Sequence, residues 1–176
     1  MWRIRLHDQD VERCAEVTTQ RQLKKARNKV KSQKYDINRT DWDILYLGTL
    51  GEVGAARALC AEVDWSVLVG GDQGYDIKIG PTTFQVKTPL SKTTRDKFYL
   101  NDEGRFSADY GILCNVDEPE VIVRGWIDRA TFVRISRLAN FGYGERMFVD
   151  ADEMLSMDQV IVARQKLYDV QIGEAC

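Results

Sequence analysis

Histidine is nearly absent from this chain, whose 176 residues include only one, His7, in the N-terminal segment. Sites that use histidine as metal ligand or base need such residues near the chemistry. The four cysteines are scattered at Cys14, Cys60, Cys114 and Cys176, and none belongs to a Cys-x-x-Cys pair. We therefore expect reduced thiols, and we exclude a His-Cys-Cys zinc site, a disulfide framework and histidine-based nuclease chemistry.

Long apolar runs are also missing, so the sequence contains no candidate membrane-spanning helix. The first eight residues, MWRIRLHD, include no apolar signal core. Walker A, Gly-x-Gly-x-x-Gly and Gly-x-Ser-x-Gly sequences do not occur, which argues against three common enzyme classes. With 44% hydrophobic and 30% charged residues, the composition is typical of a soluble globular protein. We expect a single domain without a membrane partner, in the cytoplasm of a bacterial or phage-infected cell.

Charge is distributed unevenly along the chain. Residues 21–39 contain eight basic side chains and one acid, Asp36, a local charge of +7, so the remainder carries −9 against the total of −2. Such basic blocks can follow nucleic-acid phosphates, although a solvated helix face is the alternative. The basic residues are Arg21, Lys24, Lys25, Arg27, Lys29, Lys31, Lys34 and Arg39.

The most informative stretch is 75–88, where two short alternating runs are separated by Gly80-Pro81. Alternation broken by a glycine and a proline predicts a β-hairpin. If the turn centres on this pair, Ile79 lies opposite Thr82. This register decides which side chains share a face of the sheet.

The same register places Asp76 opposite Gln85, with Lys87 on the same face two residues later. An acid, an amide and a lysine on one patch indicate a site for a metal ion and a phosphate. Asp72 is a rival acid because it also precedes the hairpin, but we favour Asp76 for its direct pairing. The apolar side chains of both strands take the opposite, core-facing side: Ile77, Ile79, Phe84 and Val86.

A helix over 40–63 is predicted, with Thr40 as its N-cap. Glu52 lies on the apolar stripe of this helix, and burying an unpaired carboxylate is costly. A metal ion or a lysine would compensate its charge; the alternative is a solvated Glu52 beside a glycine turn. Gly51 and Gly54 would let another backbone or a ligand come close. The other members of the stripe are Leu45, Thr49, Ala56, Leu59 and Val63.

Asp76, Gln85-Val86-Lys87 and the upstream Glu52 together resemble the PD-(D/E)xK nuclease superfamily. Its members include restriction enzymes, junction resolvases and some homing endonucleases, with an Asp on one strand and (Glu/Gln)-x-Lys on the next. The resemblance covers about residues 41–138. Gln85 stands where Glu is commoner, which removes one negative charge from the site.

This resemblance implies a Mg²⁺-dependent endodeoxyribonuclease, in which Mn²⁺ could substitute. Asp76, Glu52, Gln85 and the Val86 carbonyl would be the metal ligands, and Lys87 would polarise the attacking water. The catalytic set is then Glu52, Asp76, Gln85 and Lys87. Because two carboxylates are present, we expect one tightly bound metal ion.

DNA is the expected partner, bound by the basic helix and by the polar segment 88–107. Cleavage of both strands needs two sites, so a homodimer or homotetramer is expected. The alternatives are a Holliday-junction resolvase of the same fold, a catalytically inactive DNA-binding protein and an RNA-directed nuclease. The residues expected to contact nucleic acid are Arg21, Lys24, Lys25, Arg27, Lys31, Lys92, Arg95 and Lys97.

The fold class expected from this order of elements is α/β, with a mixed central β-sheet flanked by helices. The family resemblance implies a restriction-endonuclease-like core at 40–138, preceded by a basic helical extension (1–39) and followed by a C-terminal element (139–176). The remaining predicted elements are a helix over 8–34, strands over 65–69, 110–116 and 121–127, a loop or short helix over 88–107, a helix over 131–138, and a loop over 139–150 in which a strand at 147–149 is the alternative.

Overall fold

The computed structural model describes residues 1–28, 39–67, 74–100, 106–142 and 144–159. Its helices include α1 (Asp8–Arg27), α2 (Asp41–Ala58), α3 (Arg129–Ile135) and the 3-10 helix η2 (Ala151–Glu153). Its strands are β1 (Trp2–Arg5), β2 (Ile77–Ile79), β3 (Thr82–Lys87), β4 (Lys97–Leu100), β5 (Tyr110–Asp117), β6 (Glu120–Asp128), β7 (Arg137–Asn140) and β8 (Glu145–Asp150).

Two sheets form the β-structure of the described residues. The larger sheet has five strands in the order β1-β6-β5-β3-β2, and the smaller has three in the order β4-β8-β7. Neighbouring strands are antiparallel except β3 and β5, which run parallel. The expected mixed α/β architecture is therefore confirmed.

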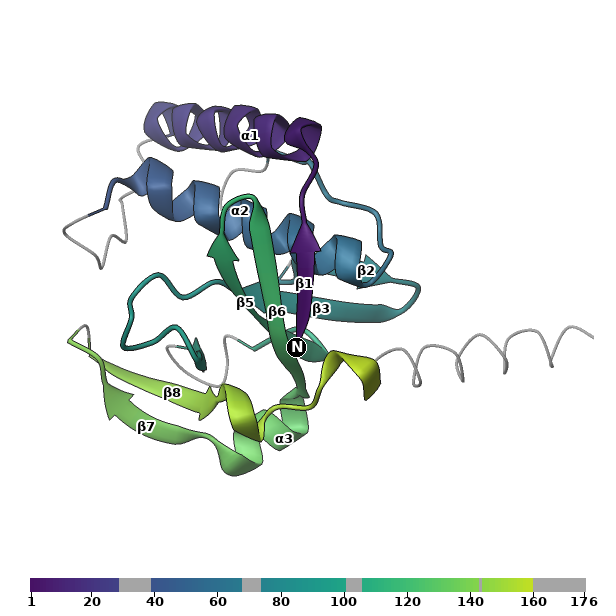
Figure 1. The fold of residues 1–176 in the computed structure, drawn as a ribbon. Coiled ribbons are helices and arrows are strands. Elements are labelled where there is room, and N and C mark those ends of the chain that lie inside the picture. Colours follow the sequence, from purple (N-terminus) through teal and green to yellow (C-terminus); the bar gives the residue numbers. More distant parts are fainter. Residues whose placement is uncertain (29–38, 68–73, 101–105, 143, 160–176) are drawn as a thin grey trace, which may run out of the picture.

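The molecule is layered, as Figure 1 shows with α1 (purple) above α2 (blue) and strands β7 and β8 of the small sheet (green to yellow) at the bottom. Helix α2 packs on strands β3, β5 and β6 of the large sheet, and α1 packs on α2. The small sheet and α3 cover the opposite side. The helices α1 and α2 thus cover one face, whereas a second sheet, which the sequence did not predict, takes much of the other.

Each interlayer space holds its own apolar cluster. Between α2 and the large sheet lie Leu50, Val53, Phe84, Val86 and other buried side chains. On the far side, Leu113 of β5 packs with residues of the small sheet and of α3. Burying such side chains contributes roughly 25 cal/mol per Å² of apolar surface.

Local signals account well for α2. Thr40 accepts a hydrogen bond from the Asp43 backbone N–H, and the Asp43 side chain accepts one from the Thr40 N–H, which completes a capping box. The predicted N-cap is confirmed. Glycines within the helix do not split it, because packing on the sheet outweighs their low propensity.

Several other predicted elements are confirmed. Strands β5 and β6 match the predictions for 110–116 and 121–127, and the hairpin forms with the predicted pairing of Ile79 and Thr82. The predicted helix over 8–34 corresponds to α1, which ends at Arg27. Its predicted continuation beyond Asn28 lies outside the described residues.

Four predictions of local structure were wrong. Residues 65–67 form no strand, and 68–69 lie outside the described residues. The predicted loop at 88–107 contains β4. In the predicted loop at 139–150, β8 includes the alternative strand at 147–149 and extends beyond it at both ends, so this prediction was wrong only in part. The helix predicted over 131–138 ends at Ile135, since the chain enters β7 at Arg137. These short strands are fixed by pairing with each other and by burial, which local propensity does not reveal.

The N-terminal segment contributes to the large sheet. Strand β1 was not predicted, and it pairs with β6 from Trp2 opposite Val123 to Arg5 opposite Glu120. Buried side chains of α1 include Cys14 and Val17.

No helix in the described ranges is long and apolar enough to cross a membrane.

Candidate functional site

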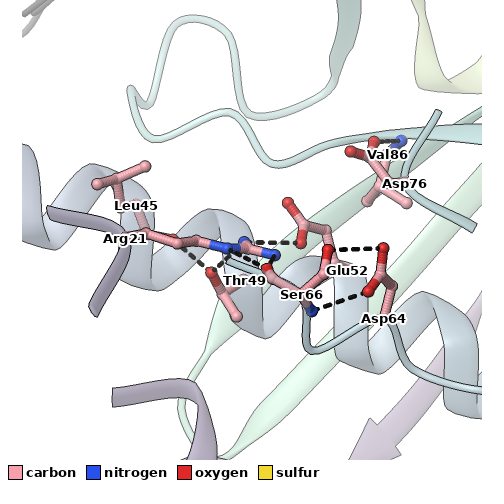
Figure 2. Close-up of polar contacts among 8 residues, drawn as sticks. All are labelled: Arg21, Leu45, Thr49, Glu52, Asp64, Ser66, Asp76 and Val86. Atoms are coloured by element: carbon pink, nitrogen blue, oxygen red, sulfur yellow. Dashed lines mark hydrogen bonds and ion pairs between the residues drawn. The ribbon is translucent and has the colours of Figure 1, made fainter. Parts of the chain in front are cut away.

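The predicted acid, Asp76, stands directly before β2 and is fixed to β3. Its backbone N–H donates to the Phe84 carbonyl at 2.8 Å. Its carboxylate Oδ2 accepts from the Val86 backbone N–H at 2.6 Å (Figure 2). The two bonds flank Gln85, so Asp76 lies across from Gln85 as the predicted register requires. Because β2 begins at Ile77, the edge of β3 toward β2 is paired at Val86 by the Asp76 side chain, whereas β5 pairs with the other edge.

Glu52 reaches the same end of β3 from α2. The helix approaches the sheet closely here, since a Cβ placed on Gly51 would lie 2.0 Å from the Thr88 Oγ1. Thr88 follows Lys87, the last residue of β3, so Glu52 neighbours a point of direct contact between helix and strand end. The sequence predicted that Gly51 permits a close approach; the group that approaches is a threonine side chain.

Arg21 of α1 compensates the charge of Glu52, where the sequence reasoning expected a lysine or a metal ion. Its Nη1 lies 3.3 Å from the Glu52 Oε2, and the two side chains are 21% and 28% exposed. The same guanidinium donates to the Thr49 hydroxyl and to the Ser66 carbonyl, each at 3.3 Å (Figure 2). Arg21 thereby joins α1, α2 and the connection that follows α2.

That connection is fixed further by Asp64, which accepts hydrogen bonds from the Ser66 N–H at 2.8 Å and from the Ser66 hydroxyl at 3.1 Å. Lys24 donates to the neighbouring Val67 carbonyl at 2.5 Å. The sequence reasoning missed this network. Its only signals were Thr49 on the stripe of Glu52 and a basic α1, because the connection has no regular structure to predict.

The side chains of Gln85 and Lys87 project from the face of β3 that is turned away from α2. Phe84 and Val86 point into the cluster under α2, whereas Gln85 pairs in register with Gly111, and Lys87 with Leu113, which belongs to the second cluster. The structure thus brings Glu52 and Asp76 to the end of β3, and it sends the two other predicted side chains to the opposite face of that strand.

Two side-chain oxygens near this strand end are buried without a hydrogen-bond partner. They are the Gln85 Oε1 and the Thr88 Oγ1. A buried acceptor left unpaired costs about 1–3 kcal/mol. Such a group therefore calls for a specific partner, and a cation is one that an amide oxygen can satisfy.

The donor set suits a hard divalent cation. Carboxylates, an amide oxygen and a backbone carbonyl are the ligands that Mg²⁺ accepts, usually together with several waters. Within the described residues, no group of three or more His, Cys, Asp or Glu side chains could hold a metal ion. A cation at the end of β3 would rely on Asp76 and Glu52, with the Val86 carbonyl and water completing its shell. Gln85 lies on the face of β3 away from α2, so its unpartnered oxygen could reach such an ion only from the other side of the strand.

The carboxylates of the site contribute to the raised pKa values of two buried thiols. Burial raises the pKa of Cys14 to about 12, with further contributions from Asp10 and Glu52. Burial, with a smaller contribution from Asp76, also raises the pKa of Cys114 well above its ordinary value. Both thiols remain protonated at neutral pH, so neither is a metal ligand or nucleophile.

The basic residues predicted to bind nucleic acid have different surroundings. Lys97 forms an ion pair with Asp150 and lies 4.8 Å from the centre of the Phe148 ring. Arg21 and Lys24 are partly buried through the contacts above, and Lys31 lies outside the described residues, as does the rival acid Asp72. The exposed members of the set are Lys25, Arg27, Lys92 and Arg95.

Comparison with protein-family models and with curated proteins finds no match to this chain.

Proposed function

We propose that this protein is a Mg²⁺-dependent DNA endonuclease whose site lies at the C-terminal end of β3. The observation that carries the proposal is that Asp76 and Glu52 both lie near the C-terminal end of β3, where the buried Thr88 and Gln85 oxygens have no hydrogen-bond partner. The resemblance of these residues to the PD-(D/E)xK pattern supports it.

Each residue has a defined task in this proposal. Asp76 and Glu52 would hold the metal ion, assisted by the Val86 carbonyl, and Gln85 would contribute from the opposite face of β3. A bound Mg²⁺ would supply a nucleophilic water and neutralise charge on the phosphate. Lys87 is the last residue of β3, and its side chain makes no hydrogen bond or ion pair with other described residues. Its ammonium would stabilise the negative charge that develops on the phosphate oxygens.

Exposed basic side chains would hold the DNA. Lys25 and Arg27 occupy the last turns of α1, and Arg21 of the same helix contacts Glu52. Phosphates bound along this end of α1 would therefore lie near the proposed site. Two copies of the chain would be needed to cut both strands.

Cleavage of supercoiled plasmid, linear duplex and a four-way junction tests the proposal, with Mg²⁺, Mn²⁺ or EDTA. We expect metal-dependent cleavage that Lys87→Ala and Asp76→Asn abolish. A preference for the junction would identify a resolvase, and cleavage of RNA alone would exclude the DNA assignment. Arg134→Gln, an exposed change on α3, is the control that retains activity.

A second candidate is a DNA-binding protein without catalysis. It is favoured by the partners that both acids already have, the Val86 N–H for Asp76 and Arg21 for Glu52. Gln85, which brings no negative charge to the site, favours it as well. Retarded DNA on a gel with no product under any metal would select this candidate.

A further inference from the structure

Arg21 holds Glu52 loosely. Its contacts with Glu52, Thr49 and Ser66 are each 3.3 Å long. Charge-assisted N–H to carboxylate bonds are usually about 2.7–2.9 Å. The guanidinium divides its donors among a carboxylate, a hydroxyl and a carbonyl, and it contacts Glu52 through Nη1.

A second ion pair between the same two helices has two-point geometry and one shorter bond. Arg57 of α2 meets Asp10 of α1 with two nitrogens, Nη2 at 2.7 Å from Oδ1 and Nε at 3.3 Å from Oδ2. The Asp10 side chain is only 8% exposed. The contact between Arg21 and Glu52 lacks this two-point geometry and is longer than the 2.7 Å bond of the second pair.

We propose that Arg21 is a displaceable counter-ion for Glu52. A divalent cation and the guanidinium compete for the same carboxylate. Without metal, Arg21 neutralises Glu52; when the cation binds, Arg21 gives up this contact. The inference rests on the proposed metal site and assigns Arg21 the role of a positioning residue.

The displaced guanidinium stays beside the site, because the Ser66 carbonyl and the Thr49 hydroxyl still accept its hydrogen bonds. Its charge is then available to a phosphate oxygen. Metal binding would thus free the Arg21 guanidinium to bind a DNA phosphate. This explains why an arginine of the basic helix contacts an acid when no metal is bound.

Competition and simple positioning predict opposite effects on metal affinity. If Arg21 competes with the cation, removing its charge strengthens metal binding. If it only orients Glu52, the same change weakens binding. Mn²⁺ binding to the full chain, measured by calorimetry without DNA, separates the two and does not depend on activity.

Arg21→Gln is the test variant, because an amide still donates to the Ser66 carbonyl. We expect it to bind Mn²⁺ at least about fivefold more tightly than the wild type, from the electrostatics of adjacent charges. Arg21→Lys retains the charge and should stay within about twofold. Arg13→Gln removes an equal charge from an exposed ion pair of α1 and serves as the matched control.

Glu52 must be the residue through which Arg21 acts. In a Glu52→Gln background, Arg21→Gln should leave Mn²⁺ affinity unchanged. Unchanged or weaker binding in the single variant Arg21→Gln overturns the inference. Mn²⁺ binding that is absent in the wild type, or that survives Asp76→Asn, overturns the metal site and thus the proposed function itself.

If Arg21→Gln does not fold, the wild type still decides the question. The side-chain Nε–Hε signal of Arg21, assigned with Arg21→Lys, is followed by NMR during Mg²⁺ titration. A saturable shift, absent in Asp76→Asn, supports the displacement. An unaltered signal at saturating Mg²⁺ contradicts it.

Discussion

The Asp76 side chain has two separable properties: it accepts a hydrogen bond from β3, and it carries a negative charge. One carboxylate oxygen accepts the Val86 N–H at 2.6 Å, on the edge of β3 where β2 no longer pairs with it. A carboxylate that bonds a backbone N–H fixes that strand as well as carrying negative charge. These two properties can be separated, because an asparagine retains the oxygen acceptor and loses the charge.

Asp76→Asn should fold with a stability within about 1 kcal/mol of the wild type and lose both Mn²⁺ binding and cleavage. Asp76→Ala should also lose about 1–3 kcal/mol of unfolding free energy, because the Val86 N–H is left without its acceptor. Urea denaturation and metal titration of both variants measure these effects. Equal stability of the two variants would show that the bond to Val86 contributes little.

Cys14 provides a test at high pH. Its pKa is raised from 9.0 to about 12 in the folded protein. The unfolded chain therefore loses this proton first, so the associated stability is present below pH 9 and decreases as the pH rises toward 12. Cys14→Ala should flatten the decline in unfolding free energy between about pH 8 and pH 10.5. Cys60→Ser, a change at an exposed cysteine, is the control. An identical slope in Cys14→Ala and wild type would contradict this assignment.

At the scale of elements, α2 is the part that places Glu52. The helix begins at a capping box and packs on the large sheet through glycines that have no side chain to keep the sheet away. At Gly51 the neighbour is Thr88, and at Gly54 it is Val121, whose side-chain atoms would lie 2.4 Å from an added Cβ. The distance between helix and strand end is therefore set by glycine positions.

Gly51→Ala should lower the unfolding free energy by about 1–3 kcal/mol, because its methyl group would overlap Thr88 and separate α2 from β3. Gly48→Ala in the same helix meets no atom within 4 Å and should stabilise the protein by about 0.5–1 kcal/mol. Thermal and urea denaturation compare the two.

Thr88→Ala combined with Gly51→Ala should recover most of the loss, since the overlapping hydroxyl is removed. Cleavage and Mn²⁺ binding should follow the same order, as Glu52 moves with its helix. Full Mn²⁺ affinity in a destabilised Gly51→Ala would mean that Glu52 lies outside the metal site.

At the scale of the whole molecule, charge separates a basic segment at 21–39 from an acidic remainder. Within the described residues, this segment includes the last turns of α1, where Lys25 and Arg27 are exposed. A concentrated positive charge on an otherwise acidic molecule directs a polyanion to one place on the surface.

Replacing Lys25 and Arg27 together by Gln should weaken DNA binding and reduce the slope of log K against log salt by about 1–2. The release of fewer counterions is the reason. Fluorescence anisotropy at several salt concentrations measures both quantities, and Arg134→Gln on α3 is the control. An unchanged slope would place the DNA elsewhere on the protein.

A feature of the fold could be predicted from the sequence when the residues that determine it are close together in the chain. The hairpin, α1, α2 with its cap, β5 and β6 were predicted because periodicity, turn residues and capping residues are adjacent in the chain. The strands β1, β4, β7 and β8 were missed wholly or in part, since short strands acquire their conformation from partners distant in sequence.

The sequence by itself determined the hairpin register that puts Asp76 across from Gln85, and the helix that carries Glu52. Only the tertiary structure decided that Arg21 neutralises Glu52 and that Thr88 contacts Gly51. It also decided that Gln85 and Lys87 face the second cluster. Register is a property of neighbouring residues, whereas these contacts depend on how helices and sheets pack, which joins residues far apart in the chain.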